Sequence, residues 1–254
     1  MTGTKNNTVL LKIVAAVTFV IMIAANVMAT FGVFNDTTTA QVSNAYPNLF
    51  APAPVTFAIW GVIYALLGIF AVYQFITKKN PELLDKIRTL FSVSSIANTL
   101  WIVSWSYYLI GLALVLMIIL LISLGSINNT LKNEGFFLRL PFGIYFGWIT
   151  VATIANVTTF LVSIGFDGFL FSESTWTIIV LALGTVIASI TAVRNKDFPY
   201  SLAVIWGYIG ILIKHVSVRY FAGQYPEIVT ALTICLIVLA VTGIIALVRQ
   251  FKRK

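Results

Sequence analysis

Charged residues are scarce in this chain of 254 residues: they make up 9% of it, against 59% hydrophobic residues, and the mean hydropathy is +0.98. These values exclude a soluble globular domain and leave no room for a sizeable domain outside a membrane. Cysteine is limited to Cys235, so one chain can form neither a disulfide nor a cysteine-rich metal site. Histidine is limited to His215, and a single histidine is not by itself an argument for heme ligation.

Apolar segments of similar length follow one another along the chain, each close to the ~20 residues that span a bilayer core. They run roughly over 9–33, 54–77, 87–109, 111–130, 138–165, 174–193, 198–220 and 226–249. A segment that crosses a bilayer alone must satisfy its own backbone hydrogen bonds, which only a helix does. The sequence therefore predicts an all-α membrane protein, a bundle of about eight transmembrane helices.

Acidic residues are missing from the middle of these segments. All of them lie in connections or near segment ends: Asp36, Glu82, Asp85, Glu134, Asp167, Glu173, Asp197 and Glu227. Proton-coupled pumps and many cation carriers need a carboxylate at membrane depth, so the distribution disfavours both classes. It also disfavours a retinal protein, because a Schiff base on Lys214 would lack a buried counter-ion.

Basic residues are concentrated in every second connection between the segments. Fourteen of the sixteen lie at the two termini and in the connections 78–88, 131–139 and 194–197. The positive-inside rule assigns these to the cytoplasm, so we expect an integral multi-pass protein, in a bacterial plasma membrane, with both termini inside. The net charge of +8 is spread over short turns, which predicts contact with the anionic headgroups of the lipid bilayer and no nucleic-acid partner.

The first segment admits a second interpretation, as a signal peptide with a passable cleavage site at Val27–Ala29. Its apolar run continues through Phe31 and Val33, which is longer than the ~7–15 apolar residues of a typical signal peptide. We therefore expect an uncleaved first helix.

Lys214, His215 and Arg219 are basic residues on the predicted outer side, near the end of the seventh segment. The simpler interpretation is that Lys214 extends its side chain to the headgroups. The alternative is a cationic rim that binds an anionic group of a ligand, such as a propionate.

Aromatic and amide residues recur at helical spacing in three segments. The second segment carries Phe57, Trp60 and Tyr64 on one stripe, the third carries Asn98 and Trp101, and the fifth carries Trp148 and Asn156. One interpretation is a packing seam in which the amides hold helices together, Asn98 and Asn156 bonding each other. The other is a ligand pocket. Trp105 and Trp176, near predicted outer ends, are most simply interfacial residues.

In these residues the chain resembles the TspO/MBR family, the tryptophan-rich sensory proteins related to the mitochondrial translocator protein. Pro52 and Pro54 followed by Phe57, Trp60 and Tyr64 are similar to the pattern of that family's first helix. The run Asn98–Trp101 is similar to its Asn-x-x-Trp motif, and Trp148, Ala152 and Asn156 match the spacing in its fourth helix. Phe57 precedes Trp60 by three residues rather than four, and Pro141 lies seven residues before Trp148 rather than four.

The resemblance covers residues 47–194 as a five-helix TspO/MBR-like unit. It leaves residues 1–46 as an N-terminal helix with an outer loop, and 195–254 as two further helices with a basic tail. It implies that a planar apolar ligand, with protoporphyrin or heme as the candidate tetrapyrrole, binds in a pocket lined by aromatic residues. By position these residues are Phe57, Trp60, Tyr64, Asn98, Trp101, Trp148 and Asn156. The stretch 78–88 is too short and charged to form the lid that covers the pocket mouth in the family.

The sequence contains no nucleophile, acid–base pair or metal cluster that we recognise, so we predict no catalytic residues and leave enzymatic activity open. Two other functions stay open. One is a small-molecule secondary transporter or permease component, which the three additional helices and Gly207 and Gly210 favour, and the other is a membrane scaffold whose aromatic stripes bind partner helices. A homodimer also stays open.

Overall fold

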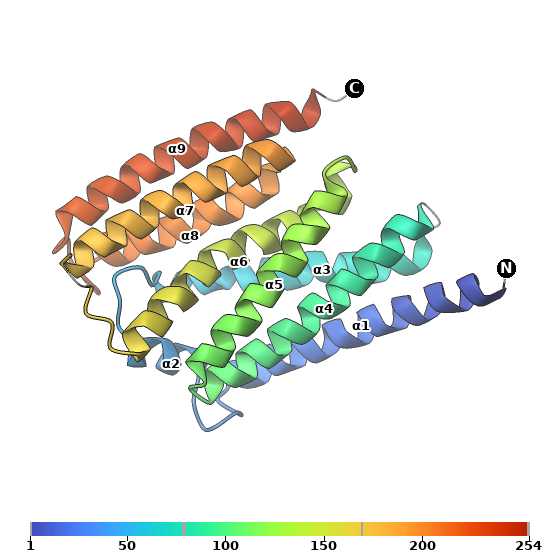
Figure 1. Cartoon of the computed structure of the whole chain (residues 1–254), viewed down its shortest axis with the longest axis horizontal. Coiled ribbons are helices and arrows are strands. Elements are labelled where there is room, and N and C mark those ends of the chain that lie inside the picture. Colours follow the sequence, from blue (N-terminus) through green and yellow to red (C-terminus); the bar gives the residue numbers. More distant parts are fainter. Residues whose placement is uncertain (1, 78–79, 169, 253–254) are drawn as a thin grey trace. The chain divides into compact units, whose positions relative to one another are not determined.

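The computed structural model describes residues 2–77, 80–168 and 170–252. Lys78, Lys79, Arg253 and Lys254, to which the sequence assigned a cytoplasmic side, lie outside these residues. Within them the regular structure is helical (Figure 1). The helices are α1 (Thr2–Thr30), α2 (Thr39–Ala45), η1 (Pro54–Ala58), α3 (Ile59–Ile76), α4 (Pro81–Ser106), α5 (Ile110–Leu131), α6 (Phe136–Ser163), α7 (Glu173–Asn195), α8 (Phe198–Val216) and α9 (Pro226–Phe251).

Each apolar segment of the sequence forms one long helix, which confirms an all-α multi-pass membrane protein. Seven of these helices are long and apolar enough to cross a bilayer, and α4 is the exception. Helix α4 is less apolar because it carries several serines and Asn98 beyond its charged first turns. Most of those polar residues are buried in the structure, so α4 keeps them away from lipid.

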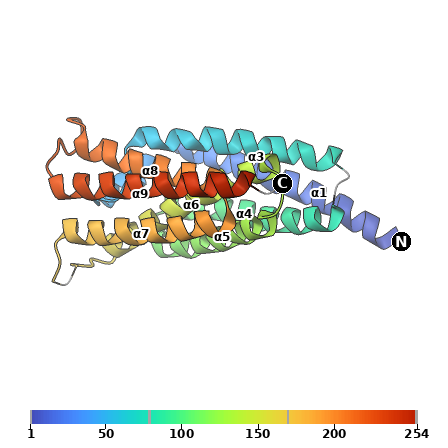
Figure 2. The same cartoon turned by 90° about the horizontal axis from the view of Figure 1, so that it is seen from above.

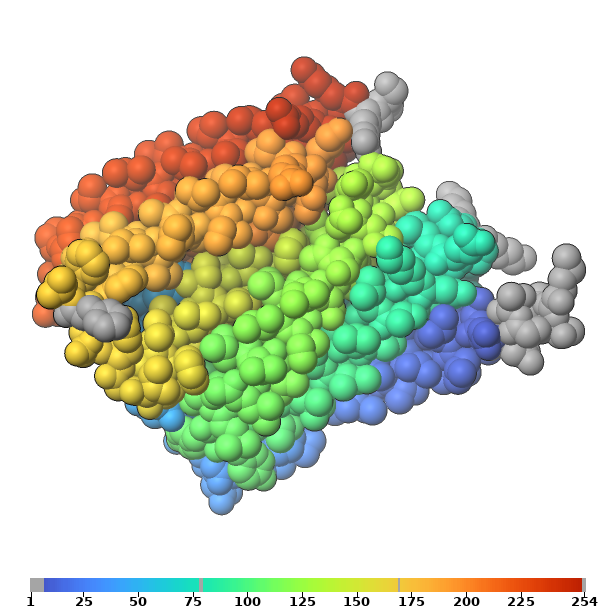
Figure 3. Space-filling model, viewed as in Figure 1, coloured from blue at the N-terminus to red at the C-terminus, as the bar shows by residue number. Residues whose placement is uncertain are grey.

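The chain divides into two compact units, with the divisions falling inside α2, α3 and α6. The first unit comprises residues 1–42 and 61–142, and the second comprises residues 43–60 and 143–254. In the first unit α4 packs against both α1 and α5, as the adjoining atoms in Figure 3 show. In the second unit α9 packs against α7 and α8, and Figure 2 shows α8 and α9 side by side. The division into 1–46, 47–194 and 195–254 stays a prediction.

Several element ends differ from the predicted ones. Helix α4 begins at Pro81, not near residue 87, because the side chain of Asn80 accepts a hydrogen bond from Leu83 N (3.3 Å) and caps the helix. Helix α8 ends at Val216 and not at residue 220, so Lys214 lies in its last turn. Pro141 lies inside the second turn of α6 rather than at its entry.

A buried arginine joins three helices of the first unit. Arg88 of α4 is 1% exposed and donates to Gln74 Oε1 (3.2 Å) and Gln74 O (3.0 Å) of α3 and to Asp85 Oδ1 (2.5 Å). Thr8 of α1 donates to the other oxygen of the same carboxylate, Asp85 Oδ2 (2.7 Å). Because each of these groups satisfies another, the charge of Arg88 is tolerated inside the protein.

Glycines allow α6 and α8 to approach closely in the second unit. A Cβ atom added to Gly147 would collide with the backbone oxygen of Tyr200 and lie 2.9 Å from the Cβ of Ala203. A Cβ at Gly207 would lie 2.9 Å from Val151 Cγ1. Small residues at such positions bring helix backbones together in membrane proteins, so this seam is a packing contact.

We predict that Gly147→Ala lowers the stability of the purified protein in detergent by about 1–3 kcal/mol, because the added methyl group meets backbone that has to shift. Gly61→Ala is the matched control, since a Cβ at Gly61 meets nothing within 4 Å and alanine is the better helix former. Thermal unfolding followed by circular dichroism compares them. Equal melting temperatures for the two variants would contradict the close contact.

We predict that Arg88→Met destabilises the first unit by about 3–5 kcal/mol, because the side chains of Gln74 and Asp85 lose a buried partner. Lys86→Met removes the same charge from an exposed position of the same helix and should change stability by about 0.5 kcal/mol or less. Denaturant unfolding in detergent measures both. An Arg88→Met protein as stable as the Lys86→Met protein would show that the network is dispensable.

Candidate functional site

Three of the predicted ligand-binding residues come together in the second unit. The ring of Trp148 lies 5.8 Å from that of Phe57 and 6.2 Å from that of Trp60, centroid to centroid, and both pairs are edge-to-face at 84°. Tyr145 adds a further edge contact to Trp60 at 5.9 Å. Trp148 is 2% exposed whereas Phe57 is 41% exposed. The cluster is therefore buried on the α6 side and open at η1.

The indole N–H of Trp148 is buried and has no hydrogen-bond partner within residues 2–77, 80–168 and 170–252. Other tryptophans of the chain donate to backbone oxygens: Trp206 Nε1 to Thr56 O (2.8 Å), Trp176 Nε1 to Gly168 O (2.7 Å) and Trp105 Nε1 to Thr39 O (3.3 Å). Buried N–H groups in proteins are nearly always paired, so Trp148 is the residue at which an acceptor is expected.

The other predicted residues are held by contacts of their own. Asn156, also in the second unit, donates to Ala152 O of its own helix (2.9 Å). In the first unit Asn98 accepts a hydrogen bond from Asn26 of α1 (2.7 Å), and the ring of Trp101 lies 6.0 Å from that of Trp105. The bond between α1 and α4 is the kind of interhelical contact that the packing interpretation expects, although it joins Asn98 to Asn26 and not to Asn156.

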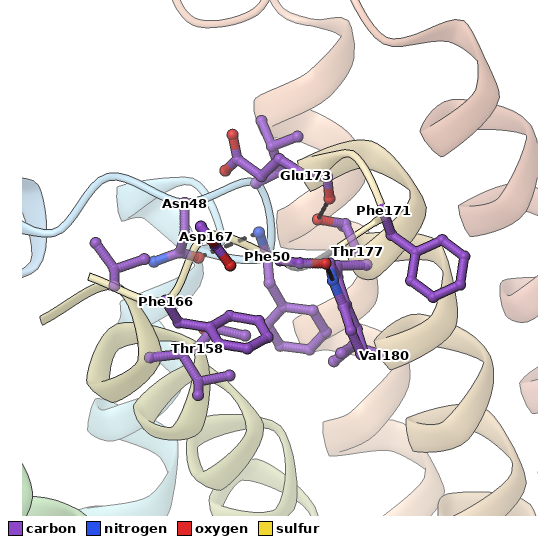
Figure 4. Close-up of a pocket in the computed structure, with 14 residues that line it drawn as sticks. Asn48, Phe50, Thr158, Phe166, Asp167, Phe171, Glu173, Thr177 and Val180 are labelled. Atoms are coloured by element: carbon purple, nitrogen blue, oxygen red, sulfur yellow. Dashed lines mark hydrogen bonds between the residues drawn. The ribbon is translucent and has the colours of Figure 1, made fainter. Parts of the chain in front are cut away.

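A pocket of about 150 Å³ lies elsewhere in the second unit, between the segments 48–50, 158–168 and 171–180 (Figure 4). None of the predicted ligand-binding residues lines it. Figure 4 shows the rings of Phe50 and Phe166 close together, with the carboxylates of Asp167 and Glu173 on one side of them. Its lining comes from the connections 34–53 and 166–173, which carry acids and no basic residue, and from the adjoining turns of α6 and α7. The acidic composition of these two connections is the sequence signal that could have indicated the pocket.

The first wall of this pocket is fixed by hydrogen bonds. Asn48 Oδ1 accepts from Phe50 N (3.2 Å) and Ala51 N (2.9 Å), which holds the loop in a tight turn. His215 Nε2 donates to Leu49 O (2.9 Å), since a carbonyl can only accept. Ala53 N donates to Gly210 O (2.9 Å). His215, a candidate for a cationic rim, and Gly210, which favoured a transporter, therefore both hold this loop against α8.

The opposite wall is fixed by Trp176. Its ring makes edge contacts with Phe166 (5.8 Å) and Phe171 (5.7 Å), and its bond to Gly168 O ties the loop to α7. Ser172 caps α7 by accepting from Thr175 N (3.2 Å). Trp176 therefore has an internal structural role, and Trp105 is 5% exposed. Both indoles donate to backbone oxygens of the protein, and the interfacial position expected for Trp105 and Trp176 stays a prediction.

The chain matches the family model described as TSPO-like protein over residues 12–245. The chain belongs to the TSPO-like family. The match confirms the resemblance found in the sequence and extends it, because it runs from α1 into α9 and so takes in helices on both sides of residues 47–194. No curated protein and no solved structure matched.

Chemically, the TSPO-like chain offers aromatic surfaces and few ligating groups. Within the described residues, no three side chains of His, Cys, Asp or Glu are grouped so that they could hold a metal ion. The features able to hold an organic ligand in the second unit are the cluster of Phe57, Trp60 and Trp148 and the pocket beside Trp176.

We predict that His215→Leu destabilises this TSPO-like protein by about 1–3 kcal/mol, because Leu49 O loses its buried donor. His215→Gln is the control, since its amide can donate to the same oxygen and should recover part of the loss. Hydrogen exchange of residues 48–53, read by mass spectrometry, should rise in the leucine variant. Unchanged exchange in that variant would mean that His215 does not hold the loop.

Proposed function

We propose that this TSPO-like protein is a membrane receptor for a planar apolar ligand of the tetrapyrrole class, such as protoporphyrin or heme. The proposal is carried by the indole N–H of Trp148, which is buried without a partner in the described part of the chain and lies beside the rings of Phe57 and Trp60. Leaving such a donor unsatisfied costs about 1–3 kcal/mol. An acceptor on the ligand's edge would recover that cost while its flat ring packs against the aromatic side chains.

Exposure of the aromatic side chains supports the same proposal. Phe57 and Trp206 of α8 are exposed, whereas Trp148, which contacts Phe57, is buried. Trp206 bonds Thr56 O, the residue before Phe57, so its ring is held near the start of the cluster. The proposed ligand-binding residues also include four that match the family pattern by position: Tyr64, Asn98, Trp101 and Asn156.

The charge alternation of the connections supports a bacterial plasma membrane with both termini in the cytoplasm, and we include this orientation in the proposal. A regulatory role for the bound ligand, in a monomer or a homodimer, belongs to the proposal as well.

A transporter is the second candidate, favoured by the three additional helices, but the two glycines that also favoured it have another explanation. Gly207 packs on Val151, and a Cβ at Gly210 would collide with the side chain of Thr56, so both glycines permit close packing. Flux of a labelled ligand into sealed vesicles separates a transporter from a receptor. A scaffold would keep its assembly and bind no ligand after Trp148→Ala.

We predict that the protein in detergent binds protoporphyrin and heme at one saturable site, read by the Soret band and by tryptophan quenching. Trp148→Phe should weaken binding about 5- to 100-fold, because it removes a buried indole N–H that lacks an acceptor while keeping an aromatic ring. Trp101→Phe should weaken it as well if the family pattern holds.

Trp176→Phe is the matched control, because it leaves the same number of tryptophans for quenching and its indole already donates to Gly168 O. Its affinity for protoporphyrin should equal that of the natural chain. Equal weakening by Trp148→Phe and Trp176→Phe, or no saturable binding by a folded protein, would refute the proposed site.

A further inference from the structure

The pocket beside Trp176 is too small for the proposed tetrapyrrole. Its volume is about 150 Å³, whereas pockets for larger organic ligands usually measure about 300 Å³ or more. An apolar cavity of about 150 Å³ accepts a molecule the size of benzene. The pocket therefore suits a single ring and is separate in its lining residues from the cluster around Trp148.

Aromatic side chains form part of its wall, beside the aliphatic Leu49, Leu161, Val162 and Val180. Phe50 is 1% exposed, Phe166 is half-buried, and the edge contacts of Trp176 with Phe166 and Phe171 fix the orientation of its indole. The N–H of Trp176 is already bonded to Gly168 O, so this ring offers its face and not its donor. Faces of aromatic rings attract cations as well as other rings.

The open side of the pocket carries negative charge. Asp167 and Glu173 line the pocket and are exposed, and no lysine or arginine lines it. Two neutral polar side chains of the lining bond backbone groups: that of Asn48 bonds three groups of its own loop, and the hydroxyl of Thr177 donates to Glu173 O (2.8 Å). A ligand group held at this opening by charge must therefore be positive.

Hydrogen bonds tie both walls to helices in the structure without a ligand. The loop 48–53 is bonded to His215 and Gly210 of α8, and the loop after α6 is bonded to Trp176 of α7. A preformed pocket costs little ordering when it binds, so even a small ligand can be held with useful affinity.

We propose that this pocket is a binding site for a small organic cation: one aromatic or aliphatic ring that carries a protonated amine. The ring occupies the space between Phe50, Phe166 and Trp176, and the ammonium group lies at the opening beside Asp167 and Glu173. The site is additional to the proposed tetrapyrrole site.

The test uses 2-phenylethylammonium as the probe and 2-phenylethanol as its neutral counterpart, each titrated against the full chain in detergent. Saturation-transfer NMR and calorimetry measure binding, with empty micelles as the blank. The ammonium compound should bind saturably and about tenfold more tightly than the alcohol. Asp167→Asn combined with Glu173→Gln should remove that preference and leave the alcohol unchanged.

Asp36→Asn is the matched control, because Asp36 is an acid of another outer connection and does not line the pocket. Val180→Trp fills the pocket from α7 and should abolish binding of both probes. It tests the site independently if the double acid variant does not fold. Equal affinity for the two probes, absence of saturable binding, or binding that survives Val180→Trp would each overturn the proposal.

The same variants separate the two sites. Trp148→Phe should leave ammonium binding unchanged, and the acid and Val180→Trp variants should leave protoporphyrin binding unchanged. Loss of protoporphyrin binding alone therefore tests the receptor proposal, and loss of the ammonium preference alone tests the pocket.

Discussion

Polar groups that enter a bilayer must find partners inside the protein, and most features of this TSPO-like chain follow from that constraint. Helix α4 has the least apolar sequence of the long helices, and its polar side chains are buried where α1 and α5 pack against it. Asn98 pairs with Asn26, and Arg88 is satisfied by Gln74 and Asp85. The helices with continuous apolar faces leave those faces exposed for lipid.

The indoles obey the same constraint with one exception. Trp105, Trp176 and Trp206 each donate to a backbone oxygen that is distant in the sequence or lies in a loop, and these bonds hold irregular segments against helices. Trp148 is buried more deeply than these three, yet its N–H has no acceptor in the described part of the chain. An unsatisfied buried donor is a cost to stability, and such costs are commonly retained where a ligand supplies the partner. For that reason Trp148 is the most informative member of the predicted set.

Close helix approach explains a second group of residues. Gly147, Gly207 and Gly210 lie where α6, α8 and η1 meet with almost no space for a side chain. The same contact brings the carbonyl of Gly210 to Ala53 and brings His215 to Leu49, so the packing of α8 also shapes the loop that forms one wall of the pocket. Packing and site formation therefore depend on the same residues.

The sequence by itself determined the number and order of the long helices, the membrane class, the family and the alternation of charge, because hydropathy, length and motif spacing are local properties. Helix ends were less predictable, since the cap at Asn80 and the early end of α8 depend on single side chains. Only the tertiary structure decided which amide met which: Asn98 met Asn26, 72 residues away, and His215 met the carbonyl of Leu49, 166 residues away. It also decided that the indoles of Trp176 and Trp105 donate to backbone oxygens, and that a pocket forms where the connections 34–53 and 166–173 meet. Periodicity predicts which face of a helix a residue occupies. Its hydrogen-bond partner depends on which remote segments of the chain pack within bonding distance.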